Sequence, residues 1–195
     1  MNATRNAPVL AFASQAEWEA WLAAQPAASP GVWLKFAKKS AGAPSVTKLE
    51  AIDSALCYGW IDGQIGRFDE HWFLTRFTPR RRGSRWSEVN RDNVLRLMAA
   101  GRMQPGGLAQ VQAAQADGRW DAAYAPQSRA EVPEDLQQAL EARPEAKAFF
   151  ATLTGANRYA VLYRIQDAKK AETRARRIQT FVQMLARGET VHGKP

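Results

Sequence analysis

Apolar residues near the N-terminus recur with the spacing of two helices that turn one face to a core. Trp18, Trp21 and Leu22 lie three and four residues apart, which is the helical period. We expect this helix to begin at Ser14 and a second one at Thr47, because each is followed three residues later by the Glu of a capping box. The expected inward residues of the second helix are Leu49, Ile52, Ala55 and Leu56.

Short runs rich in β-branched and aromatic residues predict the strands of a small sheet. The runs with this composition are 8–12, 32–38, 60–68 and 71–77. Asp69 and Glu70 separate the last two runs and supply a short acidic turn. These two runs are therefore predicted to pair as a β-hairpin.

From residue 79 onward the pattern is mainly helical. Helices are expected over 86–100 and 108–116, with Pro105–Gly107 as a turn before the second of them. Pro133 and Pro144 each precede acidic residues, so each is expected at the first position of a further helix.

These patterns together predict an α+β protein. A small antiparallel sheet with helices forms its N-terminal part, at about 8–78, and a mostly helical part follows at about 86–188. A length of 195 residues suits one domain over 1–195. The hydrophobic share of 46% and the charged share of 24% are those of a globular protein and argue against disorder.

Several classes of protein lack support in this sequence. No apolar run has the length of a transmembrane segment, and the N-terminus does not have the pattern of a signal peptide, so we expect a cytoplasmic protein. Cys57 is the single cysteine, which excludes an internal disulfide. His71 and His192 are the two histidines, and no cluster with metal-ligand spacing, P-loop or dinucleotide fingerprint is present. We therefore expect no metal and no cofactor.

The charge is strongly basic. The formal net charge is +8 and the pI is near 10.0, which favours anionic partners such as a small phosphorylated molecule or a nucleic acid. An arginine-rich composition without any such role is the alternative.

The last helix is expected to have a basic face. A break is predicted near Asp167, with that residue as the N-cap. The expected inward stripe is Ala168, Ala171, Ala175, Ile178, Val182 and Leu185. The candidate ligand-binding residues on the other side are Lys169, Lys170, Thr173, Arg174 and Arg177. Glu172 is the one acid within this cluster, so an anionic ligand would relieve repulsion between like charges; a solvated helix face is the alternative.

A second basic cluster leads into the helix expected at 86–100. Backbone N–H groups at a helix start, together with arginine and serine side chains, suit a phosphate or carboxylate. Its candidate ligand-binding residues are Arg80, Arg81, Arg82, Ser84, Trp86 and Asn90. A basic surface loop is the alternative.

A third candidate lies where a helix passes into a strand. Trp60, Asp62 and Gln64 stand between and beside glycines there and could line a pocket. Asp62 is the one candidate for a general base, and a structural ion pair or a turn contact is the alternative.

Three segments in this order resemble the YdeI/OmpD-associated family, also called bacteriocin-protection proteins. They read EAIDSALCYGWIDGQ, TPRRRGSRWSEVN with AAGRMQPGG, and AKKAETRARRI, and the resemblance runs from about Trp18 to Gly188. It implies a bacterial protein with a link to resistance against bacteriocins or antimicrobial peptides, or to an outer-membrane porin. It implies no established activity and no catalytic residues.

Three functional hypotheses follow. The first is a module that binds an anionic ligand or a nucleic acid through the basic loop and the basic helix. The second is an enzyme that acts on a small anionic substrate with Asp62. The third is a protein-interaction component of a stress-resistance pathway.

Overall fold

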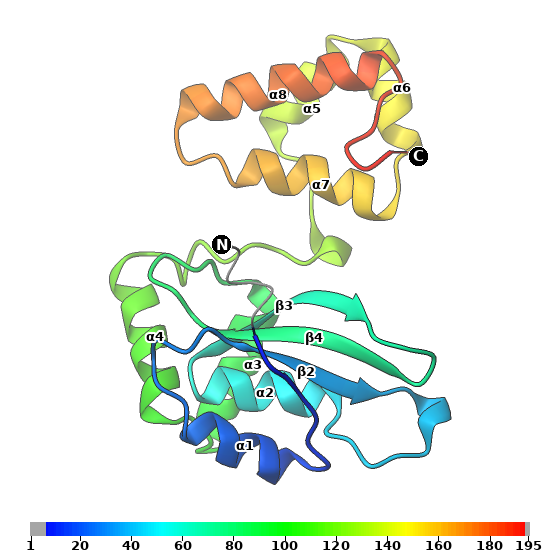
Figure 1. The fold of residues 1–195 in the computed structure, drawn as a ribbon. Helices are drawn as coiled ribbons and strands as arrows, with labels where there is room; N and C mark the ends of the chain where they lie inside the picture. Colours follow the sequence, from blue (N-terminus) through cyan, green and yellow to red (C-terminus); the bar gives the residue numbers. More distant parts are fainter. Residues whose placement is uncertain (1–6, 194–195) are drawn as a thin grey trace. The chain divides into compact units, whose positions relative to one another are not determined.

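The computed structural model describes residues 7–193. The chain divides into two compact units, Met1–Ala123 and Tyr124–Pro195. We call them the N-terminal unit and the C-terminal unit and describe each by itself. The first holds a four-stranded sheet and the second is helical, which confirms the predicted α+β class (Figure 1).

The N-terminal unit is built on a sheet with the strand order β1-β2-β4-β3. Its strands are β1 (Val9–Leu10), β2 (Val32–Ala37), β3 (Trp60–Arg67) and β4 (Trp72–Pro79). The hairpin of β3 and β4 is confirmed, and the Asp69 carboxylate fixes its turn by accepting hydrogen bonds from the backbone N–H groups of His71 and Trp72. The short edge strand β1 pairs with β2 in parallel, because a helix connects the two strands, so the sheet is not antiparallel throughout as predicted.

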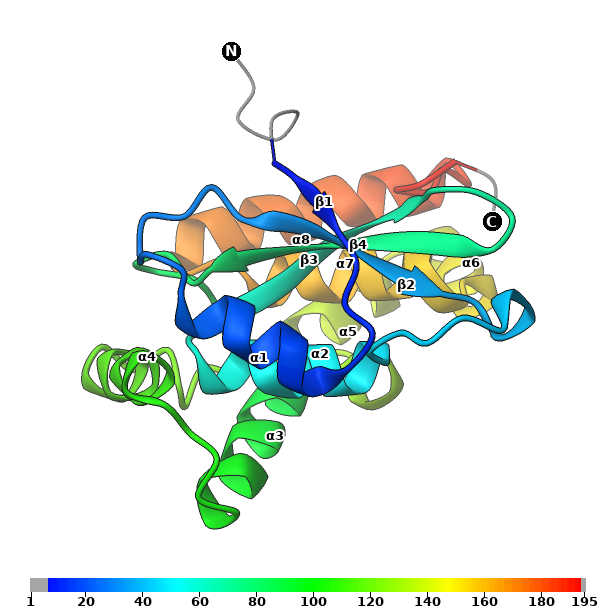
Figure 2. The same ribbon diagram turned by 60° about the horizontal axis from the view of Figure 1, so that its bottom comes forward.

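A 3-10 turn at Lys39–Ala41 and four α-helices complete the described part of the N-terminal unit. The helices are α1 (Gln15–Ala23), α2 (Lys48–Cys57), α3 (Glu88–Ala99) and α4 (Pro105–Ala116). The first two cover one face of the sheet (Figure 1), where Trp18 is fully buried and donates its indole N–H to the Ala51 carbonyl oxygen. Figure 2 shows α3 and α4 beside α2, on its side away from the strands. The helix α2 therefore lies between two hydrophobic clusters, one with the sheet and one with α3 and α4.

The capping of these helices agrees with the sequence in part. Thr47 and Glu50 form the predicted capping box. Ser14 caps α1, but the Glu17 carboxylate accepts a hydrogen bond from the backbone of Ala13, not from that of Ser14.

Two further expectations for the N-terminal unit are wrong. Leu49 is 79% exposed, because it lies about 200° around α2 from the buried Ala51. Pro105–Gly107 forms the first turn of α4 and not a separate turn. The small residues at 106 and 107 let this turn approach the end of α2 closely, and the Gln104 N–H donates to the Cys57 carbonyl oxygen there.

The C-terminal unit consists of four helices and a short 3-10 turn at Gln127–Arg129. The helices are α5 (Glu134–Glu141), α6 (Pro144–Thr152), α7 (Gly155–Gln166) and α8 (Ala171–Ala186). Pro133 precedes α5 as its N-cap, one position earlier than expected, and Pro144 is at the first position of α6. The last helix, α8, contacts the other three, and its buried residues are Ile178, Phe181, Val182 and Leu185.

The expectations for α8 need two corrections. Asp167 ends α7 as its C-cap, and α8 begins three residues beyond Ala168. Ala171 and Ala175 are exposed, because the core contacts of α8 start only at Ile178. The two alanines line a shallow groove of about 610 Å³ between α5 and α8.

Candidate functional site

A pocket lined by four arginines lies at the end of β4 in the N-terminal unit. The arginines are Arg76, Arg80, Arg81 and Arg82. The loop after α1, at 27–30, forms the opposite wall, and the cavity volume is about 540 Å³. No carboxylate is among the residues that line this pocket. The wall is therefore strongly cationic.

Arg76 is, with Arg80, one of the two buried arginines of this pocket. It lies on β4 beside Trp33 of β2, and its side chain is buried, with the residue 9% exposed. Its Nη2 donates a hydrogen bond of 2.7 Å to the Pro30 carbonyl oxygen. Its Nη1 is buried and has no hydrogen-bond partner within residues 7–193. A buried guanidinium needs compensation for its lost hydration, and this one has a single neutral hydrogen-bond acceptor and the Trp33 ring, whose centroid is 5.7 Å away.

Arg80 is held by the residues that follow it. Its backbone N–H donates to the Gly59 carbonyl oxygen, and its Nη1 donates to that of Arg85. Its guanidinium lies 3.6 Å from the centroid of the Trp86 ring, which gives a cation–π contact. Trp86 is itself 2% exposed. Trp86 therefore positions the Arg80 guanidinium and does not itself face a ligand. The sequence alone could not distinguish these two roles.

The other residues of the basic loop shape its turn and the helix start. The Ser84 hydroxyl accepts a hydrogen bond from the Arg81 N–H, which closes the turn. Asn90 lies in the first turn of α3, where its N–H donates to the Ser87 hydroxyl. Arg81 and Arg82 are exposed on the loop and line the arginine pocket.

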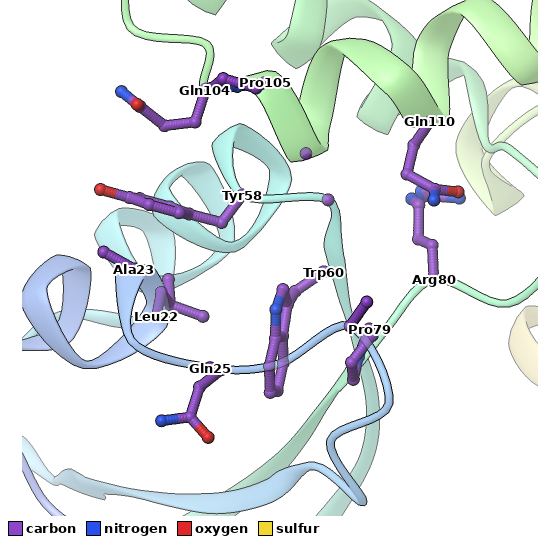
Figure 3. A pocket seen from close by; sticks show the side chains of 13 residues that line it. Leu22, Ala23, Gln25, Tyr58, Trp60, Pro79, Arg80, Gln104, Pro105 and Gln110 are labelled. Carbon is purple, nitrogen blue, oxygen red and sulfur yellow. The ribbon is translucent and has the colours of Figure 1, made fainter.

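A second pocket, of about 440 Å³, shares lining residues with the first. Ala27, Pro79 and Arg80 line both cavities. Apart from Arg80, its polar lining is uncharged and consists of Gln25, Tyr58, Gln104 and Gln110. We call it the amide pocket. Its walls come from the end of α1, the junction of α2 with β3, and the start of α4 (Figure 3).

Several polar groups of the amide pocket remain available for hydrogen bonds to a ligand. The side-chain N–H groups of Gln25 and Gln104 donate to the carbonyl oxygens of Trp21 and Arg102, which orients both amides. Their own carbonyl oxygens keep their accepting capacity. Burial raises the pKa of the Tyr58 hydroxyl, so this group stays protonated and can donate at neutral pH.

Glycine contacts fix the wall between α2 and α4. Gly59 has φ +79°, and a Cβ atom built on it would lie 2.7 Å from the Gly106 carbonyl oxygen. Gly59 and Gly106 both line the amide pocket. This part of the cavity is therefore formed by main chain.

The three residues predicted at the start of β3 are separated by the structure. Trp60 is 4% exposed and lines the amide pocket. Gln64 is exposed at the irregularity between Asp62 and Ile65. Burial raises the pKa of the Asp62 carboxyl, and the charges of Lys48 and Arg80 oppose that rise. Asp62 lines neither of the two cavities.

The basic residues predicted on the last helix belong to the C-terminal unit. Lys169 and Lys170 are exposed in the turn before α8, and Thr173 is half-buried. Arg174 binds the Asp135 carboxylate of α5 through Nε at 2.5 Å and Nη2 at 2.8 Å. Its Nη1 donates a hydrogen bond to the Ile165 carbonyl oxygen. Asp135 is 39 residues away from Arg174 in the chain, so the sequence did not reveal this ion pair. The positive charge of Arg174 is therefore balanced by an acid that the sequence did not indicate.

Arg177 is also engaged within its own unit. Its Nη1 donates to the Arg164 carbonyl oxygen and lies 3.4 Å from the Asp167 carboxylate. Two of the predicted anion-binding residues, Arg174 and Arg177, thus have structural partners on the helices around α8.

The Asp135–Arg174 pair predicts a pH dependence. Its hydrogen bond to Arg174 holds the pKa of Asp135 below the usual range, so the contribution to stability is present at neutral pH and is lost as pH falls through that lowered pKa. The side chains are 44% and 28% exposed, so solvent screening limits the effect. Asp135→Asn should lower the free energy of unfolding by about 0.5–1 kcal/mol at pH 7.

Urea unfolding followed by circular dichroism at pH 7 and at pH 3 measures this effect. The neighbouring substitution Glu134→Gln is the control. A deficit for Asp135→Asn that is equally large at both pH values would contradict the prediction.

Several residues of the two cavities were not among those predicted from the sequence. One signal was available for Arg76, because it is a charged residue inside an otherwise apolar strand pattern. Gln25, Tyr58, Gln104 and Gln110 carried no comparable signal, since only the fold brings these segments together.

The described residues also show whether a metal cluster, a membrane helix or an exposed cysteine is present. No group of three or more His, Cys, Asp or Glu side chains among residues 7–193 is placed to hold a metal ion. None of the helices described there has the length and apolar character needed to cross a membrane. Cys57 is buried, and burial raises the pKa of its thiol.

Comparison with known families places both parts of the chain. Residues 10–110, slightly more than half of the chain, match a domain of unknown function, DUF8412. Residues 129–188 match the family described as Bacteriocin-protection, YdeI or OmpD-Associated, and this confirms the resemblance noted in the sequence. The first two motifs of that resemblance lie in the first match and the third in the second. No curated protein and no solved structure matches the chain. The chain therefore belongs to the family defined by the domain of unknown function DUF8412, and its C-terminal part matches the bacteriocin-protection family.

Proposed function

We propose that the N-terminal unit binds a small anionic ligand in the arginine pocket. The observation that carries this proposal is the position of Arg76, which is buried, lines the pocket and has one neutral hydrogen-bond acceptor. An anion that carries a phosphate or carboxylate group would supply the missing charge and further acceptors. Guanidinium groups bind such groups through paired, charge-assisted hydrogen bonds.

The shape of the site favours a small molecule over a nucleic acid. The four arginines line a cavity of about 540 Å³, which lies within the usual range of roughly 300–1,000 Å³ for small-ligand sites. Nucleic acids are bound mainly by extended basic surfaces. In this proposal the basic residues of α8 are not part of the site, because Arg174 and Arg177 are engaged within the C-terminal unit.

The enzyme hypothesis has less support. Asp62 would have to reach the substrate as a general base, yet it lines neither cavity. The interaction hypothesis is favoured by one observation, the groove between α5 and α8, whose lining is largely apolar with Ala139, Ala142, Ala171 and Ile178. It is a second candidate function, for the C-terminal unit, and it is compatible with anion binding by the N-terminal unit.

Removing the two exposed arginines of the pocket tests the proposal. The double variant Arg81→Gln/Arg82→Gln should bind inorganic phosphate at least about tenfold more weakly than the unchanged protein, since one charge-assisted hydrogen bond contributes about 1.5–3 kcal/mol. Both side chains are exposed, so the fold should be retained. Chemical-shift titration of the full chain with sodium phosphate at low ionic strength measures the dissociation constants.

The control removes the same charge elsewhere. Arg67→Gln/Arg143→Gln changes two exposed arginines outside the arginine pocket. This control should bind phosphate with nearly unchanged affinity. Equal losses in both double variants would mean that only the net charge attracts phosphate, and the proposal would then be wrong.

A further inference from the structure

The arginine pocket and the amide pocket adjoin each other and form one continuous region. Three residues, Ala27, Pro79 and Arg80, line both cavities. The loop after α1 passes along both, with Gln25 at the amide pocket and Pro30 at the arginine pocket. A ligand anchored at Arg80 can therefore extend from one cavity into the other.

The chemistry of the two cavities differs in a way that defines the ligand. The arginine pocket offers donors and positive charge. The amide pocket also offers acceptors, because the side-chain carbonyl oxygens of Gln25 and Gln104 remain available. The dianion of a phosphate monoester has only acceptor oxygens and cannot satisfy them. The group that enters the amide pocket must itself donate hydrogen bonds, and it must also accept them from Tyr58 and Gln110.

Hydroxyl groups meet this requirement, since each both donates and accepts. A nucleobase could also do so, but proteins usually hold bases by stacking them on an aromatic ring. Trp60, the larger aromatic residue of the pocket, is 4% exposed, so it presents no open face for stacking. The lining suits a hydroxyl-rich group better than a flat base.

We infer that the ligand is a phosphorylated sugar, with its phosphate among the arginines and its hydroxyl-bearing ring against Tyr58, Gln104 and Gln110. This inference rests on the proposed function, because the arginine pocket anchors the phosphate. It adds a second subsite and a class of ligand.

Isothermal titration of the full chain tests the inference. The probes are sodium phosphate, glucose, glucose 6-phosphate, ribose 5-phosphate and adenosine monophosphate. At least one sugar phosphate should bind about tenfold or more tightly than phosphate, which corresponds to one or two additional hydrogen bonds. Glucose alone should bind more weakly than that sugar phosphate.

Substitutions in the amide pocket locate the gain. Tyr58→Phe and Gln110→Ala should each remove most of the additional affinity for the sugar phosphate and leave the affinity for inorganic phosphate unchanged. Gln112→Ala, on the exposed side of the same helix, is the matched control and should change neither value.

The outcomes separate this inference from the proposed function. If phosphate binds and no sugar phosphate binds more tightly, the inference is wrong and the proposed function stands. If adenosine monophosphate binds more tightly than ribose 5-phosphate, the base is recognised and the assignment to sugars is wrong. If neither phosphate nor any sugar phosphate binds, both proposals are wrong.

Discussion

Replacing Gly107 by alanine should destabilise the N-terminal unit by about 3 kcal/mol, at the upper end of the usual cost of overpacking. A Cβ atom at this position would lie 2.2 Å from the Cys57 carbonyl oxygen and 2.7 Å from that of Leu56. Both neighbours are backbone atoms at the end of α2, so no side chain can rotate away to make room. The start of α4 would have to move, and the amide pocket would lose its shape.

Urea unfolding followed by tryptophan fluorescence measures this effect for the N-terminal unit alone. All seven tryptophans lie between Trp18 and Trp120, so the signal comes from that unit. Gly101→Ala is the control, because Gly101 has a positive φ but no atom within 4 Å of an added Cβ. It should cost only about 1 kcal/mol, the strain of a left-handed alanine. The steric argument would be refuted if Gly107→Ala cost no more than Gly101→Ala.

Replacing Trp86 by alanine should lower the stability of the N-terminal unit and weaken phosphate binding in the arginine pocket. Trp86 is 2% exposed and contacts the Trp120 ring, with 5.0 Å between the ring centroids. Trp86→Ala should therefore cost about 3–5 kcal/mol of stability, as is usual for a buried aromatic residue. The Arg80 guanidinium would lose the ring on which it lies, and phosphate binding should weaken by about fivefold, the equivalent of a cation–π contact of about 1 kcal/mol.

A conservative replacement separates these two effects. Trp86→Phe keeps an aromatic face beneath Arg80 and removes an indole N–H that has no hydrogen-bond partner in the described chain. It should retain most of the phosphate affinity while losing part of the stability. Phosphate titrations of both variants, under conditions in which each is folded, provide the comparison. If Trp86→Ala bound phosphate as tightly as the unchanged protein, the ring would have no role in positioning Arg80.

The parts of the fold that depend on local signals could be predicted from the sequence. The capping box of Thr47 and Glu50 marks the start of α2, and the acidic turn at Asp69 joins the two strands of the hairpin. Such features involve residues a few positions apart, so composition and spacing reveal them. The confirmed α+β class follows from the same kind of pattern.

Features that depend on distant contacts could not be predicted in this way. The periodicity of α2 includes Leu49 on the apolar side, but the contacts of Ala51 decide which face is buried. From the sequence, Arg174 was expected to be available to bind an anion. In the fold its guanidinium binds the Asp135 carboxylate. The amide pocket likewise draws Gln25 and Gln110 from segments 85 positions apart, so no local pattern could indicate it.

The contact between the glycines of α2 and α4 has a consequence for how ligand selectivity can change among related proteins. Gly59 and Gly106 meet through main-chain atoms, and this wall of the amide pocket does not depend on the rotamer of any side chain. Gln104 and Gln110 add their side chains to this main-chain wall and can be replaced without changing it. In the proposed site, substitutions at Gln104 or Gln110 would alter which molecule is preferred while the cavity keeps its form, so specificity could diverge on a constant scaffold.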